Sequence, residues 1–169
     1  MFNYLVAYTP RVSTPRWLSD RQQRAWRAFL QASMQLWQQL DGELQHEAGL
    51  PLAYYQMLAM LSEAPDRTLR MSELALRTWS SRSRLSHAVD RLEERGWVRR
   101  LTCPEDRRGS FAQLTDEGFA VLQAAAPSHV DSVRRHLFDL LDEDEVDALE
   151  ETSRKIAASL TCPKESDGL

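Results

Sequence analysis

Residues 80–118 read SSRSRLSHAVDRLEERGWVRRLTCPEDRRGSFAQLTDEG, and this stretch decides the fold. Serines able to cap a helix stand at its start, and Gly96 is the residue type that commonly follows a helix end, so a helix is predicted over 81–95. The segments 97–101 and 110–114 have the composition of strands, and the loop between them is long enough to project. This order predicts a winged helix-turn-helix, in which the helix enters the major groove of DNA and the hairpin reaches the backbone or the minor groove.

The predicted helix has one buried stripe and an exposed start. Leu85, Val89 and Leu92 recur at i, i+4 and i+7, which places them on one inward face. Recognition helices meet base edges near their N-terminal end, where arginine can donate two hydrogen bonds to guanine and serine suits phosphate oxygens. Arg91 and Arg95 stand among acidic neighbours and are better explained as surface ion pairs. The candidate DNA contacts are therefore Ser81, Arg82, Ser83, Arg84, Ser86 and His87.

The loop between the two strands carries Asp106, Arg107 and Arg108. Such a triplet is common in solvated turns, and it gains weight here because it lies between two strands that directly follow a basic helix. An arginine at a wing tip can enter the narrow minor groove, where the negative potential is enhanced. A nearby carboxylate can hold that guanidinium extended. We therefore expect Arg107 and Arg108 to contact DNA and Asp106 to orient the wing arginine.

The charge of the chain is unevenly distributed. Its 169 residues carry a net charge of -4, a value that argues against nucleic acid as a partner. Residues 66–113, however, hold eleven arginines against seven acids, whereas residues 1–65 are balanced and residues 114–169 hold five basic groups against thirteen acids. This asymmetry is expected if only the middle of the chain touches phosphate, although an excess of four charges is modest by itself.

Helices are predicted on both sides of the central stretch. The Ser19–Gln22 segment has the form of a capping box and opens a long amphipathic helix. Ser72 is expected to cap a short helix, and Thr115 a long one that Pro127 should kink or break. A second capping box at Asp142–Glu145 opens the last helix. The fold class predicted is mainly α with a small β-hairpin wing.

The first and last helices carry large apolar faces far from the hairpin in sequence. Helices of this kind often pair with a second subunit, so a homodimer is expected, and the alternative is that they pack on the middle of the chain. We expect an N-terminal arm over 1–18, a helical dimerisation region over 19–50 and 115–161, a winged helix-turn-helix domain over 51–114, and a disordered tail over 162–169.

Several other classes of protein are disfavoured. The longest apolar runs are far short of a membrane helix, and the N-terminus lacks the basic start of a signal peptide, so no membrane partner and a cytoplasmic location are expected. The two cysteines, Cys103 and Cys162, and the four histidines show no metal spacing, so neither a metal nor a cofactor is expected. Cys103 lies near four arginines that could lower its pKa, which suggests either a redox-sensitive thiol or an inert loop residue.

Three motifs together, LxxxGWVRR over 92–100, DRRG over 106–109 and LTDEG over 114–118, resemble the MarR-like (multiple-antibiotic-resistance regulator) family of bacterial transcription factors. The resemblance covers about residues 20–160 in the order of the elements. It implies a dimer built from the first and last two helices, with one winged helix-turn-helix per subunit. It also implies that Arg108 is the minor-groove residue and Asp106 its brace. His87 stands where the family often has another basic or polar residue.

The resemblance further implies a ligand, because members of the family are often released from DNA by small phenolic or aromatic molecules bound between the dimer helices and the DNA-binding lobe. Aromatic residues at helical spacing are more commonly core residues, so both assignments stay open for the candidates. The candidate pocket residues are Trp26, Trp37, Tyr54, Tyr55, Met57 and Trp79.

The sequence therefore favours a dimeric, sequence-specific DNA-binding repressor, released by a small aromatic or phenolic ligand and bound to a pseudo-palindromic operator of double-stranded DNA. The alternative is a winged-helix module that binds proteins and has lost DNA binding, which the acidic C-terminal third would suit. An enzyme is disfavoured, because the chain has no Ser/His/Asp order at usable spacing, no metal cluster and only six glycines, none of them in a phosphate-binding loop.

Overall fold

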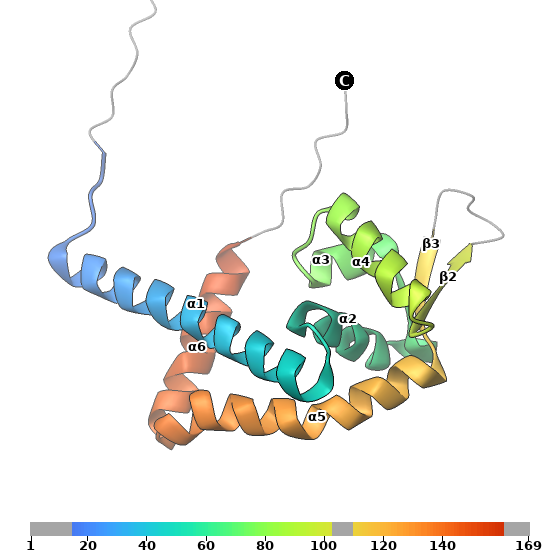
Figure 1. Ribbon diagram of the computed structural model, residues 1–169. Helices are drawn as coiled ribbons and strands as arrows, with labels where there is room; N and C mark the ends of the chain where they lie inside the picture. Colours follow the sequence, from blue (N-terminus) through green and yellow to red (C-terminus); the bar gives the residue numbers. More distant parts are fainter. Residues whose placement is uncertain (1–14, 103–109, 161–169) are drawn as a thin grey trace, which may run out of the picture. The chain divides into compact units, whose positions relative to one another are not determined.

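The computed structural model describes residues 15–102 and 110–160, most of them helical (Figure 1). The chain divides into two compact units, Met1–Gln35 and Leu36–Leu169, which are taken separately below. The elements are α1 (Asp20–Ala48), α2 (Leu52–Ser62), a 3-10 turn (Pro65–Arg67), β1 (Thr68–Arg70), α3 (Met71–Arg77), α4 (Arg82–Glu94), β2 (Val98–Thr102), β3 (Ser110–Leu114), α5 (Asp116–His136), a second 3-10 turn (Phe138–Leu140) and α6 (Glu143–Ser159).

The first unit contains the N-terminal part of α1. The predicted capping box is confirmed, because the Ser19 main-chain N–H donates to the Gln22 side chain at 2.9 Å and the Gln22 N–H donates to Ser19 Oγ at 3.3 Å. Large apolar side chains on this part of the helix stay half exposed, among them Trp26 at 50 % and Phe29 at 53 %. The two rings lie 6.4 Å apart.

The second unit is built around a three-stranded antiparallel sheet with the order β1-β3-β2. Leu69 of β1 pairs with Ala112 of β3, which in turn pairs with Arg100 of β2. Leucines from α2, α3 and α4 complete the core, as Leu58, Leu61, Leu74, Leu85 and Leu92 are each at most 1 % exposed. The predicted fold class, mainly α with a small wing, is confirmed.

The helix α4 forms as the sequence predicts. Ser81 is its N-cap, and the Ser81 hydroxyl accepts from the Arg84 N–H at 3.3 Å. Gly96 follows its end with a φ of 75°, a backbone conformation that glycine adopts without steric cost. The expected cap of the preceding helix, Ser72, is wrong, because α3 begins two residues earlier than expected, at Met71, with Arg70 as its N-cap.

The junction between the sheet and α5 depends on a close approach at Gly118. Thr115 caps α5 as predicted, its hydroxyl accepting from the Gly118 N–H at 3.0 Å and donating to the Gly96 carbonyl at 2.7 Å. A Cβ added at Gly118 would lie 2.1 Å from the Trp97 carbonyl oxygen. The chain therefore needs glycine here because another main-chain segment occupies the space of a side chain.

Of the two outcomes expected at Pro127, a kink or a break, the break is wrong, since α5 runs without interruption from Asp116 to His136. A proline removes one main-chain donor and crowds the preceding turn. Packing on both sides of Pro127 offsets this cost, because Leu122 and Ala125 lie in the core and Ser132 is 2 % exposed.

A polar cluster joins the C-terminal part of α1 to the end of α5 within the second unit. Glu43 accepts hydrogen bonds from the Ser132 hydroxyl at 2.5 Å and from Gln39 Nε2 at 2.6 Å, and it meets His136 Nε2 at 2.8 Å. These contacts, the Ser132 bond first, lower the pKa of Glu43 to about 2. Arg135 adds an ion pair to Glu43 at 3.2 Å.

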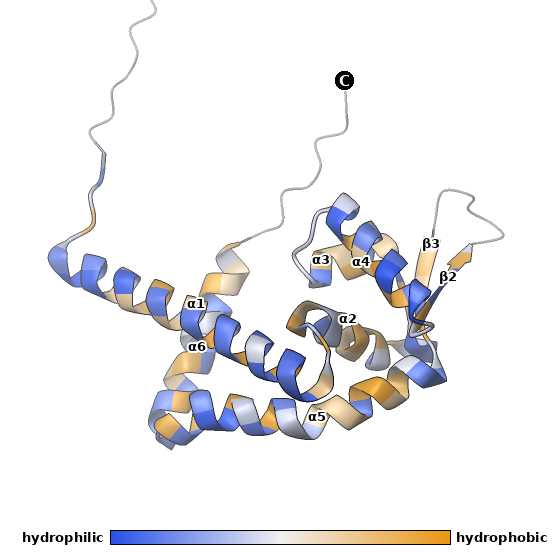
Figure 2. Cartoon of the chain, viewed as in Figure 1, coloured by the Kyte–Doolittle hydropathy of each residue, from blue (hydrophilic) through white to orange (hydrophobic). Residues whose placement is uncertain are grey.

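The helix α6 opens with the predicted capping box between Asp142 and Glu145. It has no buried residue; its apolar side chains Leu149 and Ile156 are 37 % and 42 % exposed, and its C-cap residue Leu160 is 57 % exposed. Figure 2 shows hydrophobic residues along α6, in contrast to the mainly hydrophilic outer side of α4.

Candidate nucleic-acid interface

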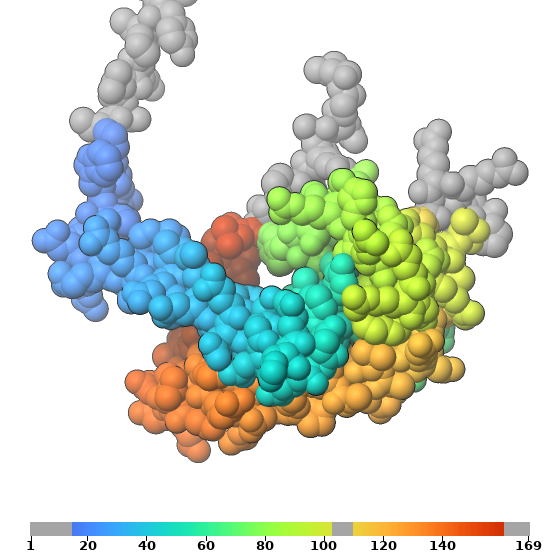
Figure 3. Space-filling view, viewed as in Figure 1, coloured from blue at the N-terminus to red at the C-terminus, as the bar shows by residue number. Residues whose placement is uncertain are grey.

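The four sides of α4 have different surroundings, and this divides its candidate residues. The inner side consists of Leu85, Val89 and Leu92, all at most 1 % exposed, as predicted. The opposite side, here the outer stripe, consists of Ser83, His87 and Glu94, all exposed to solvent. Figure 3 shows α4 at the surface of the second unit. An exposed helix face backed by a buried leucine stripe has the form required to enter a DNA groove.

On its sheet side, α4 presents Ser86, Asp90 and Glu93 at i, i+4 and i+7 to strand β2. Arg100 Nη2 donates to the Ser86 carbonyl at 2.9 Å, to the Ser86 hydroxyl at 3.2 Å and to Asp90 Oδ1 at 2.5 Å. Arg100 Nε also lies 3.5 Å from Glu93 Oε2 as an ion pair. Ser86 is thus partly buried and bonded to Arg100, unlike Ser83, which stands on the outer stripe.

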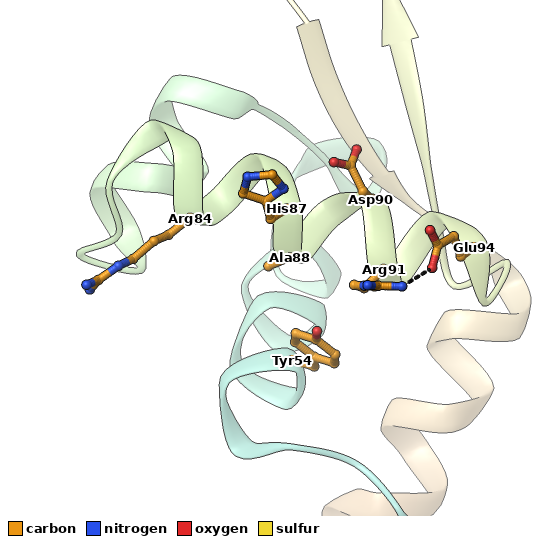
Figure 4. Close-up of a pocket in the computed structure, with 7 residues that line it drawn as sticks. All are labelled: Tyr54, Arg84, His87, Ala88, Asp90, Arg91 and Glu94. Carbon is orange, nitrogen blue, oxygen red and sulfur yellow. Dashed lines mark hydrogen bonds and ion pairs between the residues drawn. The ribbon is translucent and has the colours of Figure 1, made fainter.

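On its remaining side, α4 faces α2 across a pocket of about 580 Å³ (Figure 4). Arg84, Ala88 and Arg91 line it from α4, together with Tyr54 from α2. His87, Asp90 and Glu94 complete the lining. Two predicted DNA contacts, Arg84 and His87, therefore also border a cavity.

The ion pair expected for Arg91 is confirmed, because Arg91 Nη1 lies 2.9 Å from Glu94 Oε2. This bond raises the pKa of Arg91. Arg95 lies over the ring of Trp97, 4.9 Å from its centroid. Asp90 and Glu93, which the sequence placed around these two arginines, instead meet Arg100.

The other predicted DNA contacts divide between described and undescribed parts of the chain. Ser81 caps α4 and Arg82 is exposed in its first turn. Asp106, Arg107 and Arg108, and Cys103 with them, lie outside the described residues, between β2 and β3.

The six candidate ligand residues lie in different surroundings. Met57 is in the core, at 5 % exposure, and Tyr55 packs against His129 with ring centroids 4.4 Å apart. Burial raises the pKa of Tyr55 and lowers that of His129. Tyr54 lines the pocket beside α4. The three tryptophans are exposed, at 50 % for Trp26, 51 % for Trp37 and 67 % for Trp79.

Sequence reasoning missed Arg100. The sequence did contain a sign of these contacts, because Ser86, Asp90 and Glu93 are spaced at i, i+4 and i+7. This spacing marks a polar stripe on the helix beside its buried apolar stripe. What the sequence did not supply was the register that brings Arg100 rather than Arg99 to that stripe.

Within residues 15–102 and 110–160, no group of three or more His, Cys, Asp or Glu side chains is placed to hold a metal ion. None of the helices in the same part of the chain combines the length and the apolar character that crossing a bilayer requires.

The capped, exposed helix α4, with the β2-β3 hairpin directly after it, defines a winged helix-turn-helix protein. Residues 48–109 match the sequence profile of the MarR family. The chain is 31% identical over 121 residues to the transcriptional repressor MprA of Escherichia coli, covering 72% of this chain and 68% of MprA. The chain belongs to the MarR family of transcriptional regulators, and it is not an enzyme.

Solved structures of the family agree with this assignment. Sco3205 of Streptomyces coelicolor, a MarR family transcriptional regulator crystallised in complex with DNA, is 48% identical with a TM-score of 0.85, covering 92% of this chain and 98% of that one. AbsC of the same organism, also a MarR family transcriptional regulator, is 44% identical with a TM-score of 0.81, covering 86% and 98%.

Proposed function

We propose that this regulator is a homodimeric repressor that binds a pseudo-palindromic operator through the N-terminal half of α4 and the wing. The observation that carries the proposal is the outer stripe of α4, where Ser83 and His87 stand exposed behind the capped N-terminus at Ser81. Two relatives support it, because MprA is named a transcriptional repressor and Sco3205 was crystallised with DNA. A regulator of this kind works at the chromosome, so the proposal includes a cytoplasmic location.

The DNA-binding part of the proposal is tested by selecting bound duplexes from a random pool. Arg82→Ala and His87→Ala should each weaken binding to the selected operator by about tenfold, which corresponds to the 1–3 kcal/mol of one base contact. Arg154→Ala is the matched control, since Arg154 lies on α6 in an exposed i,i+4 pair with Glu150. Equal losses for Arg82→Ala and Arg154→Ala, with no loss for His87→Ala, would mean that only overall charge matters and that α4 does not read the operator.

The proposal of a dimer is supported by apolar side chains that stay exposed on α5, on the 3-10 turn after it and on α6. In the second unit, Val130 and Phe138 are 53 % and 41 % exposed, and the apolar residues of α6 are exposed too. Exposed apolar faces of this kind are typical of association surfaces. Light scattering should give twice the mass of the chain, and Ile156→Asp should shift the mass to that of a monomer. A monomeric wild-type protein at micromolar concentration would rule out the dimer.

Two-fold symmetry of the protein would be mirrored in its operator. Half-sites should then be about one helical turn, roughly 34 Å, apart and inverted. The logarithm of the affinity should fall steeply with the logarithm of the salt concentration, because phosphate contacts release counterions.

Release by a small ligand fits the pocket between α2 and α4. Tyr54 offers a ring and Arg84 a cation among the residues that line this pocket, which suits an aromatic acid, and His87 belongs to the same lining. Operator release by a panel of aromatic acids, followed by fluorescence anisotropy, tests this. Tyr54→Ala should abolish the response, whereas Tyr55→Phe, which alters the neighbouring ring against His129, should retain it. A response unchanged in Tyr54→Ala would exclude this pocket.

A further inference from the structure

Arg100, on strand β2, joins the sheet to α4 through hydrogen bonds from its Nη2 and through two ion pairs. Its guanidinium meets the Ser86 carbonyl and hydroxyl, Asp90 at 2.5 Å and Glu93 at 3.5 Å. These three partners form one stripe of α4. The Arg100 side chain is 29 % exposed, against 50 % for the Asp90 side chain, so it is less accessible to solvent than the side chain that it pairs with.

A second bond joins the same residues through the main chain. The Arg100 N–H donates to Glu93 Oε1 at 3.0 Å. In the described sheet β2 lies at the edge, next to β3 alone, so this N–H is a donor that the sheet leaves unpaired. Glu93 therefore receives both the side chain and the main chain of Arg100, which fixes the distance between β2 and α4.

The contacts have an electrostatic consequence for DNA binding. Asp90 and Glu93 lie on the same helix as the candidate DNA contacts, and Asp90 follows His87 by three residues. Unpaired carboxylates close to phosphate oxygens would repel them, and such repulsion acts over about 10 Å at moderate salt. Arg100 places one positive charge between the two carboxylates and so reduces that repulsion.

The contacts also have a mechanical consequence. Arg100 lies two residues before the end of β2 at Thr102, where the chain leaves the sheet toward the wing loop. The hydrogen bonds from Nη2 to the Ser86 carbonyl, the Ser86 hydroxyl and Asp90 hold the end of the Arg100 side chain against one stripe of α4. The position of β2, as far as its end at Thr102, is therefore tied to α4.

We propose that Arg100 is a positioning residue for DNA binding, which sets the wing against α4 and masks Asp90 and Glu93 from the phosphates, without contacting DNA itself. This inference rests on the proposed operator binding. Arg99 provides the comparison, because it precedes Arg100 on the same strand and carries the same charge, yet its Nε donates to Gln113 of β3 at 2.6 Å.

The test measures operator affinity by fluorescence anisotropy for the full-length protein and for Arg100→Met, Arg99→Met, Asp90→Asn and the double variant R100M/D90N. R100M should weaken binding at least tenfold, and R99M less than threefold. In the wild type, D90N should weaken operator binding slightly, because it removes the ion pair with Arg100. In R100M, D90N should strengthen operator binding severalfold, because it removes a carboxylate charge that Arg100 no longer masks. The reversal of sign at unchanged urea midpoints is the decisive readout, because a residue that only stabilised the fold would change affinity together with stability.

Urea unfolding of each variant separates binding from folding, and Arg100→Lys serves if R100M does not fold. Lysine keeps the charge but not the guanidinium, so R100K should lose at least threefold in affinity, and D90N should not improve it, because the charge that masks Asp90 is still present. Equal losses of operator affinity in R100M and R99M would overturn the inference. The same effect of D90N on affinity in the wild type and in R100M would also overturn it. Neither result would contradict the proposed operator binding. A wild-type protein that binds no DNA in the selection would remove the proposed function and this inference together.

Discussion

Replacing Gly118 with alanine should destabilise the winged domain severely. The new Cβ would lie 2.1 Å from the Trp97 carbonyl oxygen, 2.8 Å from the Trp97 carbonyl carbon and 2.8 Å from Leu114 Cδ1. The main chain cannot easily yield, because the Trp97 carbonyl already accepts the Thr115 N–H at 3.0 Å. Overpacking that can be relieved by small shifts costs about 1–3 kcal/mol, so a main-chain clash of this depth should cost roughly 3 kcal/mol or more. Typical domains have only about 5–15 kcal/mol of stability in total.

The chain supplies its own control for that prediction. Gly42 lies within α1, and a Cβ there would meet nothing within 4 Å. Since alanine is favoured over glycine inside a helix by about 1 kcal/mol, Gly42→Ala should raise the free energy of unfolding. Urea denaturation followed by circular dichroism at the helix band measures both variants. A loss below about 1 kcal/mol in Gly118→Ala, or any loss in Gly42→Ala, would show that the packing argument at the β3-α5 junction is wrong.

Three further predictions use other parts of the chain. Trp79→Gly should stabilise the fold by about 1 kcal/mol, because Trp79 adopts a φ of 49°, in the left-handed region that favours glycine, and its side chain is 67 % exposed. A melting temperature no higher than that of the wild type would contradict this prediction. The pKa of Glu43 is lowered to about 2, so the stability that ionised Glu43 contributes is complete above its ordinary pKa of 4.5 and is lost as the pH falls toward 2. The urea midpoint should therefore fall more steeply between pH 4.5 and pH 2 in the wild type than in Glu43→Gln. Parallel curves for the two proteins would exclude this contribution of Glu43. Arg108→Ala should weaken operator binding strongly while the dimer stays folded, which a gel-shift series with parallel light scattering checks.

The parts of the fold that could be predicted from the sequence are those set by neighbours within one element. The cap at Ser81, the end at Gly96 and the stripe of Leu85, Val89 and Leu92 all depend on residues within a few positions of one another. Helix periodicity and capping chemistry act over that range. The outer position of His87 follows from the same periodicity.

The parts that could not be predicted depend on residues far apart in the chain. Glu43 meets Ser132 and His136 across 89 and 93 positions, and nothing local marks either partner. The need for glycine at position 118 is set by the path of the main chain at Trp97. Ser72 failed as a cap for a different reason: the strand β1 runs directly into α3, so the helix starts as soon as the pairing with β3 ends, at Met71.

The surroundings of α4 restrict where operator preference can change. Its inner side is filled by leucine and valine, its sheet side is bonded to Arg100, and its third side faces α2 across the pocket. A substitution on any of these sides alters the fold, the position of the wing or the pocket along with any DNA contact. Ser83 and His87 stand on the outer stripe, where a change of side chain disturbs none of the described core, and of the two only His87 also borders the pocket, so they are the positions at which new operator sequences can be selected with least loss of stability. A library randomised at these two positions should therefore yield folded proteins with altered half-sites, whereas one randomised at Ser86 and Asp90 should yield mainly proteins with weakened binding to every site.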